Sequence, residues 1–257
     1  MSLPFLQSEV LSANERIRHG FFTRQGGVSL APFDALNGAE KVGDDPAAVA
    51  ENRRRIIAAL GAERLALCRQ VHSDRVVQVD AAWDFDHPPE ADAMVTKLPG
   101  VALGILTADC GCVLLADPVT GVIAASHAGW RGALGGVLDR TLELMESCGV
   151  RRSDVVAAVG PCIWQESYEV EAAFLAAFEK ENAANLSFFK QGARPGHFLF
   201  DLPGYIDAKV TRLGVRTFSP SPADTCADQG RFFSYRRGCL LGAPEKGRMI
   251  SAIVRRK

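Results

Sequence analysis

"TADCGCVLLADPVTGVIAASHAGWRG", residues 107–132, contains two apolar runs with a cysteine before them and a histidine, a tryptophan and an arginine after them. The two runs, 112–116 and 122–126, are too short for helices and are continuous rather than alternating, which is typical of strands covered on both faces. The intervening DPVTG, residues 117–121, has the composition of a tight turn. The stretch therefore predicts an antiparallel hairpin centred near Val119.

This hairpin brings a cysteine and a histidine together at its open end. Folding the strands back about the turn places Cys112 opposite Ser126 and Cys110 opposite Ala128. His127 then lies about one residue from the position facing Cys110, which is within the precision of the predicted register. The sequence thus predicts a thiol and an imidazole in contact at one edge of a buried sheet.

A crossover connection continues from the same edge. Apolar side chains at steps of three and four predict a helix over 132–148, and the run 155–159 then returns as a strand parallel to 122–126. Because parallel strands end at a shared edge, GPCIW (160–164) is expected beside SHAGWRG (126–132). Ligands bind at such edges in folds with crossovers of this kind.

Elsewhere the sequence predicts further elements of an α/β fold. VALGIL, residues 101–106, has the pattern of another buried strand. A helix is expected from the N-cap Asp45 to the C-terminal stop Gly61. Its apolar face is interrupted by Asn52 and Arg53, which either reach solvent or serve a site.

Two other stretches carry weaker patterns. ENAANLSFFKQGARPGH, residues 181–197, is expected to be a long loop. FFSYRRG, residues 232–238, is expected to be an edge strand with Arg236 and Arg237 either solvated or in a site.

Composition limits the classes of function. The chain has 257 residues, of which 47% are hydrophobic and 23% charged, as in ordinary globular proteins, and we expect one domain. A net charge of -1 offers no field for nucleic acid. There is no secretory signal pattern and no apolar run of ~18 residues, so we expect a cytoplasmic protein without a membrane segment. Seven cysteines are expected to be thiols rather than a disulfide framework.

A third residue with metal-binding chemistry is His72, in a polar break of CRQVHSDRVVQVD, residues 68–80. Two imidazoles and one thiolate, from His72, Cys110 and His127, suit zinc with a fourth position open to water or substrate. Their spacing is not a compact metal signature. The alternative is that these are polar residues satisfied at strand ends.

The HAGWRG turn, which joins a buried strand to a helix, predicts an anion site. Gly129, Gly132, Gly135 and Gly136 let a ligand approach bare backbone N–H groups, and Arg131 can clamp a phosphate or carboxylate. Alternatively, the glycines only let the helix pack close to the sheet. Arg24, which precedes a Gly-Gly pair, either points into a site or solvates a turn.

Taken together, these motifs resemble the YfiH-type family, historically labelled polyphenol oxidase or laccase-domain and now associated with purine nucleoside phosphorylase and adenosine deaminase activities. The resemblance covers nearly the whole chain, and HAGWRG with TADC is its most specific part. It rests on HGFFTRQGGVS (19–29), LN (36–37), GDD (43–45), NR (52–53), QVH (70–72), TADC (107–110), HAGWRG (127–132), GPCI (160–163) and FFSYRR (232–237).

The resemblance implies a single α/β domain over residues 1–257, with a mixed β-sheet core flanked by helices, in a class shared with a deamidating toxin that has a Cys-His pair. It implies zinc on His72, Cys110 and His127, with Cys110, His127 and Arg131 as catalytic residues. The substrate-binding candidates are Arg24, Asn37, Arg53, Gln70, Asp109, Gly129 and Gly132.

The implied chemistry is phosphorolysis of adenosine, inosine and methylthioadenosine to the base and ribose 1-phosphate, together with hydrolytic deamination of adenosine. The partners are therefore purine nucleosides and inorganic phosphate, and we expect a monomer. Our hypothesis is that zinc activates a water for attack at purine C6, while Arg131 holds phosphate for attack at the ribose C1′.

The chain departs from the family pattern beside the proposed ligand Cys110. Where the family has a proline-containing pair, this chain has Gly111-Cys112. The glycine loosens the position, and Cys112 adds a second thiol on the same side of the strand as Cys110.

Other readings stay open. Copper is a less suitable metal: a single His2Cys copper site would colour the oxidised protein blue, and a four-copper laccase needs more imidazoles than five histidines provide. A metal-independent hydrolase or deamidase could use Cys110 as nucleophile and His127 as base. A non-enzymatic cell-wall editing or regulatory protein is the third possibility.

Overall fold

Two large β-sheets packed face to face form the centre of the computed structural model, which describes residues 3–257. The first is five-stranded, in the order β1 (Phe5–Leu6), β2 (Ile17–Phe22), β14 (Met249–Arg255), β6 (Val101–Thr107) and β3 (Arg64–Ala66). The second is six-stranded, in the order β13 (Thr217–Ser219), β9 (Val156–Val159), β7 (Gly111–Ala116), β8 (Ile123–Ala128), β5 (Ala93–Thr96) and β4 (Val76–Gln78). Each contains parallel and antiparallel pairs, which confirms the predicted mixed α/β fold.

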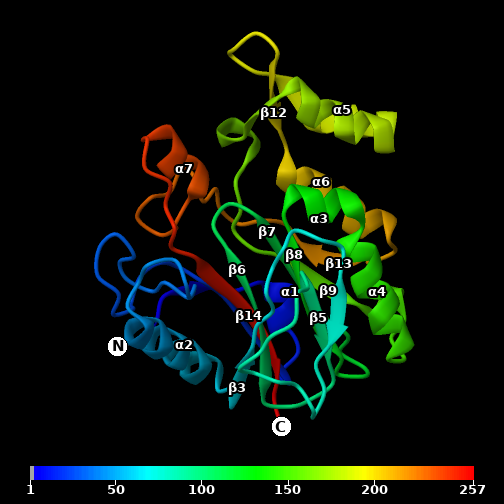
Figure 1. Cartoon of the computed structure of the whole chain (residues 1–257). Helices are drawn as coiled ribbons and strands as arrows, with labels where there is room; N and C mark the ends of the chain where they lie inside the picture. Colours follow the sequence, from blue (N-terminus) through cyan, green and yellow to red (C-terminus); the bar gives the residue numbers. More distant parts are fainter. Residues whose placement is uncertain (1–2) are drawn as a thin grey trace.

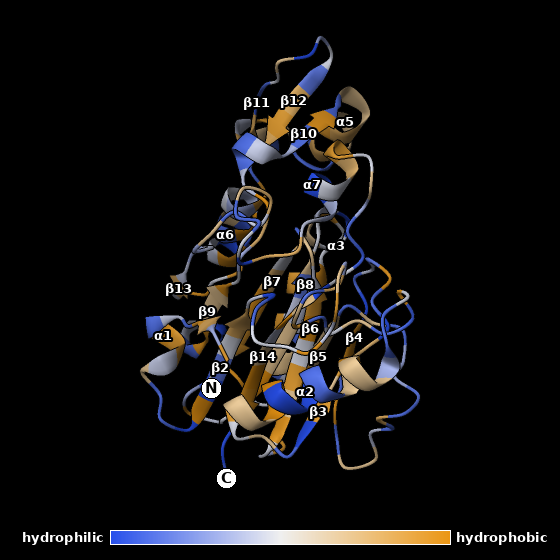
Figure 2. Cartoon of the chain, turned by 90° about the vertical axis from the view of Figure 1, so that its left-hand side faces the viewer, coloured by the Kyte–Doolittle hydropathy of each residue, from blue (hydrophilic) through white to orange (hydrophobic). Residues whose placement is uncertain are grey.

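Alternation along β7 explains why its sequence is a continuous apolar run. Leu114 and Ala116 enter the core between the two sheets, whereas Val113 and Leu115 face the opposite side. Both faces of the strand are therefore buried, as the hairpin sequence predicts. Figure 2 shows this hydrophobic band through the middle of the molecule.

Helices cover the outer faces of both sheets (Figure 1). α2 (Pro46–Leu60) packs Ile56 and Leu60 on the five-stranded sheet, with the predicted Asp45 N-cap and a left-handed Gly61 at its end. The six-stranded sheet is covered by α3 (Trp130–Gly135), α4 (Val137–Ser147) and α6 (Leu202–Arg212). α1 (Glu9–Ser12) closes one end of the core between the sheets. No helix within residues 3–257 has the length and apolar character needed to cross a bilayer.

The β7–β8 hairpin forms as predicted, but its register differs by one residue. Cys112 faces His127 rather than Ser126. The turn is centred between residues 119 and 120 because the Asp117 N–H donates to the Val122 carbonyl and the Asp117 carboxylate accepts from Val119 N–H. Cys110 thus lies just beyond the end of the ladder.

The crossover from β8 to β9 also differs in detail. Instead of one helix over 132–148 there are two, α3 and α4, separated by Gly136 at φ +99°. β9 returns parallel to β8 with β7 between them, and its end lies at the same edge. The Gly160 N–H donates to the Cys112 carbonyl there, so GPCIW lies at the expected edge of the sheet, but beside the start of β7, which separates it from SHAGWRG.

A small three-stranded sheet projects from one end of the molecule (Figures 1 and 2). It consists of β10 (Glu169–Glu171), β12 (His197–Phe200) and β11 (Phe189–Gln191), covered by α5 (Ala172–Glu181). The expectation of a long loop over 181–197 is therefore wrong. Phe178 and Phe200, with ring centroids 4.6 Å apart, extend the core on the outer face of the six-stranded sheet into this segment.

The prediction of an edge strand over 232–238 is also wrong. The segment contains α7 (Tyr235–Leu240), whose N-cap Ser234 accepts from the Arg237 N–H. Arg237 is buried: its guanidinium donates to the carbonyls of Thr225 and Phe232 and pairs with Glu245. These hydrogen bonds replace the water that would surround the guanidinium of an exposed arginine.

Candidate active site

Three metal-binding side chains from distant parts of the chain meet at the edge of the six-stranded sheet. His72 comes from the loop between β3 and β4, Cys110 from the turn before β7, and His127 from β8. Their ligand atoms all lie within 4.8 Å of one another, with 3.9 Å between Cys110 Sγ and His72 Nε2. Among residues 3–257, this is the one cluster of three or more such side chains. A thiolate with two imidazoles fits the donor set of a zinc site with an open position.

Unusual backbone conformations orient the side chains of His72 and Cys110. His72 has φ +61°, and Asp109, immediately before Cys110, has φ +88°. The carboxylate of Asp109 accepts from Thr225 Oγ at 2.7 Å and from the Arg236 N–H at 2.7 Å. Both residues occupy the left-handed region that non-glycine residues rarely adopt, so the surrounding hydrogen bonds must hold them there.

A buried carboxylate, which no sequence motif marks, lies behind the cluster. Asp92, with no exposed surface, accepts from His127 Nδ1 at 2.8 Å and from the His72 backbone N–H at 3.0 Å. It precedes β5 in PEADAMV, and nothing in that local sequence distinguishes it from a turn residue.

Cys110 and His127 shift each other's titration. Burial by itself would raise the pKa of the Cys110 thiol, but the charges and hydrogen bonding of the two imidazoles outweigh it and lower that pKa. Burial would likewise lower the pKa of His127, but Cys110 and Asp92 raise it. The pair therefore favours a thiolate, which is the form that binds metals and attacks electrophiles.

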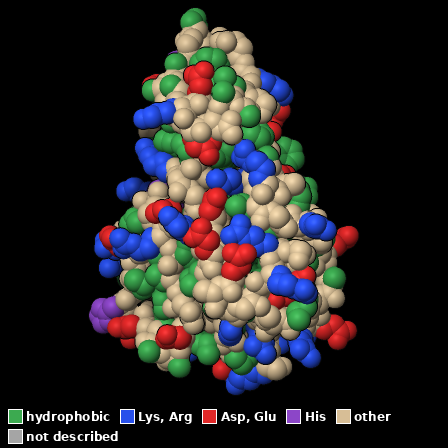
Figure 3. Space-filling model, turned by 90° about the vertical axis from the view of Figure 1, so that its right-hand side faces the viewer, with side chains coloured by type: hydrophobic (Ala, Val, Ile, Leu, Met, Phe, Trp, Pro, Cys, Tyr) green, Lys and Arg blue, Asp and Glu red, His purple; other side chains and the backbone are tan. Residues whose placement is uncertain are grey.

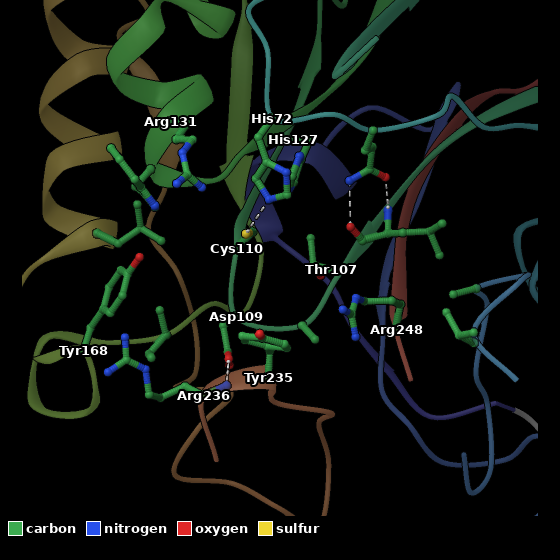
Figure 4. A pocket seen from close by; sticks show the side chains of 18 of the residues that line it. His72, Thr107, Asp109, Cys110, His127, Arg131, Tyr168, Tyr235, Arg236 and Arg248 are labelled. Carbon is green, nitrogen blue, oxygen red and sulfur yellow. Dashed lines mark hydrogen bonds between the residues drawn. The ribbon is translucent and has the colours of Figure 1, made fainter. Parts of the chain in front are cut away.

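The cluster opens into a cavity of about 700 Å³, shown in Figure 4. Apolar side chains, including Leu106, form part of its wall. Arg131 and Arg236 lie on one side of the cluster and Arg248 on the other. The ion pairs found in residues 3–257 involve other arginines, such as Arg24 and Arg237.

These cavity arginines are partly held by backbone groups instead of carboxylates. Arg236 donates to the Glu169 carbonyl at 2.7 Å and lies over the Tyr168 ring. Arg248 donates to the Glu245 and Gly247 carbonyls, and burial lowers its pKa. Positive charge without a carboxylate partner at a concave surface is suited to an anionic ligand.

Arg131 lies at the start of α3, where the anion site was predicted, with its guanidinium over the Trp130 ring at 4.5 Å. α3 has only six residues, so its dipole is weaker than that of the long helix expected from the sequence. The guanidinium groups therefore carry more of the attraction for an anion than the helix end does.

Two glycines are required by close packing around Cys110. A Cβ on Gly129 would lie 2.9 Å from Cys110 Sγ, and one on Gly111 would lie 2.4 Å from Ile206 Cδ1. The absence of a side chain at Gly111 therefore lets the start of β7 pack closely against α6. Cys112 is fully buried in the core between the sheets and is separate from the metal-binding cluster.

Of the substrate-binding candidates, Gln70 and Asp109 line the cavity. The Gln70 amide is occupied at both ends, since it donates to the Leu106 carbonyl and accepts from the Leu106 N–H, each at 2.8 Å. Gly132 is buried, and a Cβ there would lie 3.1 Å from the Ser73 carbonyl.

Arg24, Asn37 and Arg53 do not line the cavity. Arg24 donates to the Asp34 carbonyl and lies over Phe233, and Arg53 donates to the Gly38 carbonyl. Asn37 Oδ1 accepts from the backbone N–H of Arg248, which does line it.

Asn52, the other polar interruption of α2, also holds the loop behind the cavity. Its amide donates to the carbonyls of Ala35 and Asn37 and accepts from the Val28 N–H. The polar face of α2 therefore organises the loop that carries Ala39 and Val42 to the cavity wall.

The remaining histidines lie outside the cluster. His19 lies in β2, and its Nε2 accepts from the Ser8 N–H. His87 is exposed and contacts Asp84, and His197, on the small sheet, contacts the Pro195 carbonyl. The imidazoles needed for a four-copper centre are therefore not gathered in the part of the chain that the structure describes.

Comparisons with known proteins agree with the fold and the motifs. A family model described as multi-copper polyphenol oxidoreductase laccase matches residues 18–256. A Deinococcus radiodurans protein named purine nucleoside phosphorylase is 42% identical over 253 residues, covering 98% of this chain and 92% of that protein.

Two solved structures share the whole architecture. Neisseria meningitidis protein NMB0706 matches with a TM-score of 0.87 and 33% identity, covering 100% of both chains. Bacillus licheniformis YfiH matches with a TM-score of 0.82 and 26% identity, covering 93% of this chain and 92% of that one. The chain therefore belongs to the YfiH family, whose model is described as multi-copper polyphenol oxidoreductase laccase.

Proposed function

We propose that the protein is a zinc-dependent purine nucleoside phosphorylase that also deaminates adenosine. The observation that carries this proposal is a cavity in which a His-Cys-His cluster lies between guanidinium groups that have no carboxylate partner among residues 3–257. Support comes from the Deinococcus radiodurans relative named purine nucleoside phosphorylase. The proposed substrates are adenosine, inosine and methylthioadenosine, with inorganic phosphate as co-substrate.

His72, Cys110 and His127 would hold the zinc ion. Bound there, zinc would supply a Lewis acid that lowers the pKa of a water molecule or polarises a substrate oxygen. The lowered pKa of Cys110 favours the thiolate needed for ligation. Copper would use the same donors but would give the oxidised protein an intense blue colour. We expect this colour to be absent, which distinguishes zinc from copper.

We assign phosphate to the side of the cavity formed by Arg131 and Arg236. Both guanidinium groups line it, and the Tyr168 ring lies beside Arg236 (Figure 4). Planar guanidinium groups bind phosphate oxygens through paired hydrogen bonds, and partial exclusion of water strengthens the attraction. Arg131 would thus hold a phosphate oxygen for attack at the ribose C1′.

The nucleoside then occupies the rest of the cavity. Leu106, Ala39 and Val42 form an apolar wall there that a purine ring can cover. Arg248 and Thr107 supply polar groups on this side. In phosphorolysis the phosphate oxygen bonds to C1′, the C1′–N9 bond breaks, and the purine leaves with the electron pair and takes up a proton.

The remaining residues of the site act through the backbone. Asp109 fixes the turn that carries Cys110, and Gln70 fixes the end of β6. We propose that Gly129 and Gly132 contribute by letting the start of α3 pack closely against Cys110 and the Ser73 carbonyl, and that Arg24, Asn37 and Arg53 contribute by holding the loop behind the cavity.

At the level of the cell, we propose one catalytic domain over residues 1–257 that acts as a cytoplasmic monomer on small molecules. The face shown in Figure 3 carries acidic and basic side chains interspersed, without a basic stripe of the kind that binds nucleic acid. This mixed charge supports a small-molecule substrate.

The test is to incubate protein of known metal content with adenosine, with and without phosphate, and to separate the products. Adenine and ribose 1-phosphate that form only with phosphate are the expected result, together with phosphate-independent inosine from deamination. Absence of all three products would contradict the proposal. Turnover that survives complete metal removal would favour a Cys110–His127 hydrolase instead, and a cellular effect retained in Cys110→Ala would favour a non-enzymatic role.

A further inference from the structure

The Asp92 carboxylate accepts five hydrogen bonds. Its Oδ2 accepts from the backbone N–H groups of Val71 and Ser73, at 3.1 and 2.7 Å, and from Ser73 Oγ at 2.8 Å. Its Oδ1 accepts from the His72 N–H at 3.0 Å and from His127 Nδ1 at 2.8 Å. One carboxylate therefore contacts both histidines of the metal-binding cluster.

We propose that Asp92 is the positioning residue that builds the metal-binding cluster, by fixing the tautomer of His127 and the backbone of His72 together. This inference rests on the metal site of the proposed function. It adds a residue that neither touches the metal-binding position nor lines the cavity.

Asp92 determines which ring nitrogen of His127 carries the proton, because it contacts Nδ1. A carboxylate only accepts hydrogen bonds, so its contact with Nδ1 requires an Nδ1–H. In the neutral imidazole Nε2 then carries the lone pair, as a metal ligand must. The His127 N–H also donates to the Asp92 carbonyl at 2.7 Å, so the two residues are joined through both backbone and side chain.

Asp92 acts on His72 through the backbone, by accepting from its N–H. Its φ of +61° is costly for a residue with a Cβ, and three consecutive N–H groups, those of Val71, His72 and Ser73, point at the same carboxylate. These bonds hold the loop in the conformation that turns the exposed His72 ring towards Cys110. Without them the loop has no reason to keep a left-handed residue at this point.

The structure predicts the effect of Asp92→Asn. The Oδ2 position faces two fixed backbone donors and Oδ1 faces one, so the amide oxygen is expected to take the Oδ2 position. The amide NH2 then faces His127 Nδ1 and stabilises the tautomer that is protonated at Nε2. That tautomer cannot ligate through Nε2, and we expect zinc to bind about 10- to 100-fold more weakly.

Asp117→Asn is the matched control. Asp117 is also buried and also accepts several hydrogen bonds, from Val119 N–H and from the N–H and hydroxyl of Thr120. It lies at the far end of the β7–β8 hairpin from His127. This variant is expected to lower stability while leaving zinc affinity unchanged.

The experiment has two measurements on the full chain. Competition with a chromophoric chelator gives the zinc affinity of the unmodified protein, Asp92→Asn and Asp117→Asn. In zinc-free unmodified protein at a pH where His127 is neutral, 15N chemical shifts of its ring give the tautomer. We expect Nδ1 protonation in the unmodified protein and at least tenfold weaker zinc binding in Asp92→Asn alone.

The proposal is overturned if His127 in the unmodified protein is protonated at Nε2, or if Asp92→Asn binds zinc as tightly as the unmodified protein. The tautomer measurement decides even if the variant fails to fold. Failure of the unmodified protein to bind zinc would count against the metal assignment, and the tautomer would still test the role of Asp92.

Discussion

Cys110 and Cys112 are two residues apart, yet the pKa values of their thiols are shifted in opposite directions. Cys110 is half-buried at the cavity beside two imidazoles, which lower its pKa. Cys112 is fully buried between the sheets, and burial raises its pKa to about 12. The difference arises because Cys110 lies just outside the ladder, whereas Cys112 is inside it.

We therefore expect iodoacetamide to modify Cys110 far faster than Cys112 in zinc-free protein near neutral pH, because the thiolate is the nucleophile. The rate should fall as the pH is lowered, since protonation removes the thiolate, and added zinc should protect Cys110. Peptide mass spectrometry over time measures both sites. Equal labelling of the two cysteines, or labelling of Cys110 indifferent to zinc, would contradict this account.

The arginines on the phosphate side give a second prediction at this scale. Arg131→Met and Arg236→Met each remove one charged hydrogen-bond donor, so we expect the KM for phosphate to rise about tenfold or more in each variant. Arg140→Met, on the surface of α4 where Arg140 pairs with Glu143, is the control and should leave it unchanged. Steady-state kinetics with varied phosphate measure the effect. An unchanged KM in both cavity variants would remove phosphate from this side.

At the scale of elements, Gly136 decides the geometry of the crossover. It ends α3 in the left-handed region at φ +99°, and the chain then restarts as α4. This break lets α4 lie on the six-stranded sheet while α3 holds Arg131 at the cavity.

Adjacent glycines allow a matched test of this break. Gly136→Ala forces a Cβ into a left-handed conformation and should lower the free energy of unfolding by about 1–2 kcal/mol. Gly135→Ala has no neighbour within 4 Å of the added Cβ and ordinary backbone angles, so it should be neutral or stabilising by about 0.5 kcal/mol. Chemical denaturation measures both variants. Equal effects would show that the left-handed angle does not determine the break.

Sequence patterns predicted the elements whose signals are local. The helix after Asp45, the β7–β8 hairpin and the crossover to β9 follow from capping residues and apolar runs. The turn shifted the hairpin register by one residue, because side-chain hydrogen bonds of Asp117 set its centre. α7 was mistaken for a strand because the burial of Arg237 depends on distant carbonyls.

At the scale of the whole molecule, two sheets share one core, and β2 supplies part of it. His19 in β2 is buried, and its Nε2 accepts from the Ser8 N–H. Burial lowers its pKa from 6.5 to about 4, so the folded chain holds this imidazole neutral.

This gives a pH dependence with a definite sign. Between about pH 6.5 and about pH 4 the unfolded chain binds a proton that the folded chain does not, so stability falls as the pH falls through this range. The contribution of His19 approaches about 3 kcal/mol at full effect. Denaturation at pH 7 and 4.5 should show a smaller loss in His19→Gln than in the unmodified protein. Parallel losses would assign the acid sensitivity to other groups.

The division into two sheets could not be predicted from single strands. β6 and β7 are consecutive and equally apolar, yet they belong to different sheets, and β14 enters the first sheet from the far end of the chain. The role of Asp92 could not be predicted either, because it depends on contacts between distant segments. Its five hydrogen-bond donors belong to residues 71–73 and 127. His72, Cys110 and His127 were found because metal-binding residue types are rare and two of them flank one hairpin.

We expect His72, Cys110 and His127 to bind one zinc ion together. Metal analysis of purified protein, alongside Cys110→Ala, tests it most directly. We expect one zinc per chain in the unmodified protein, which a chelator removes and added zinc restores. We expect Cys110→Ala to lose that zinc while circular dichroism shows an intact fold. An unmodified protein that takes up no zinc, or a folded Cys110→Ala that binds it as tightly, would contradict the claim.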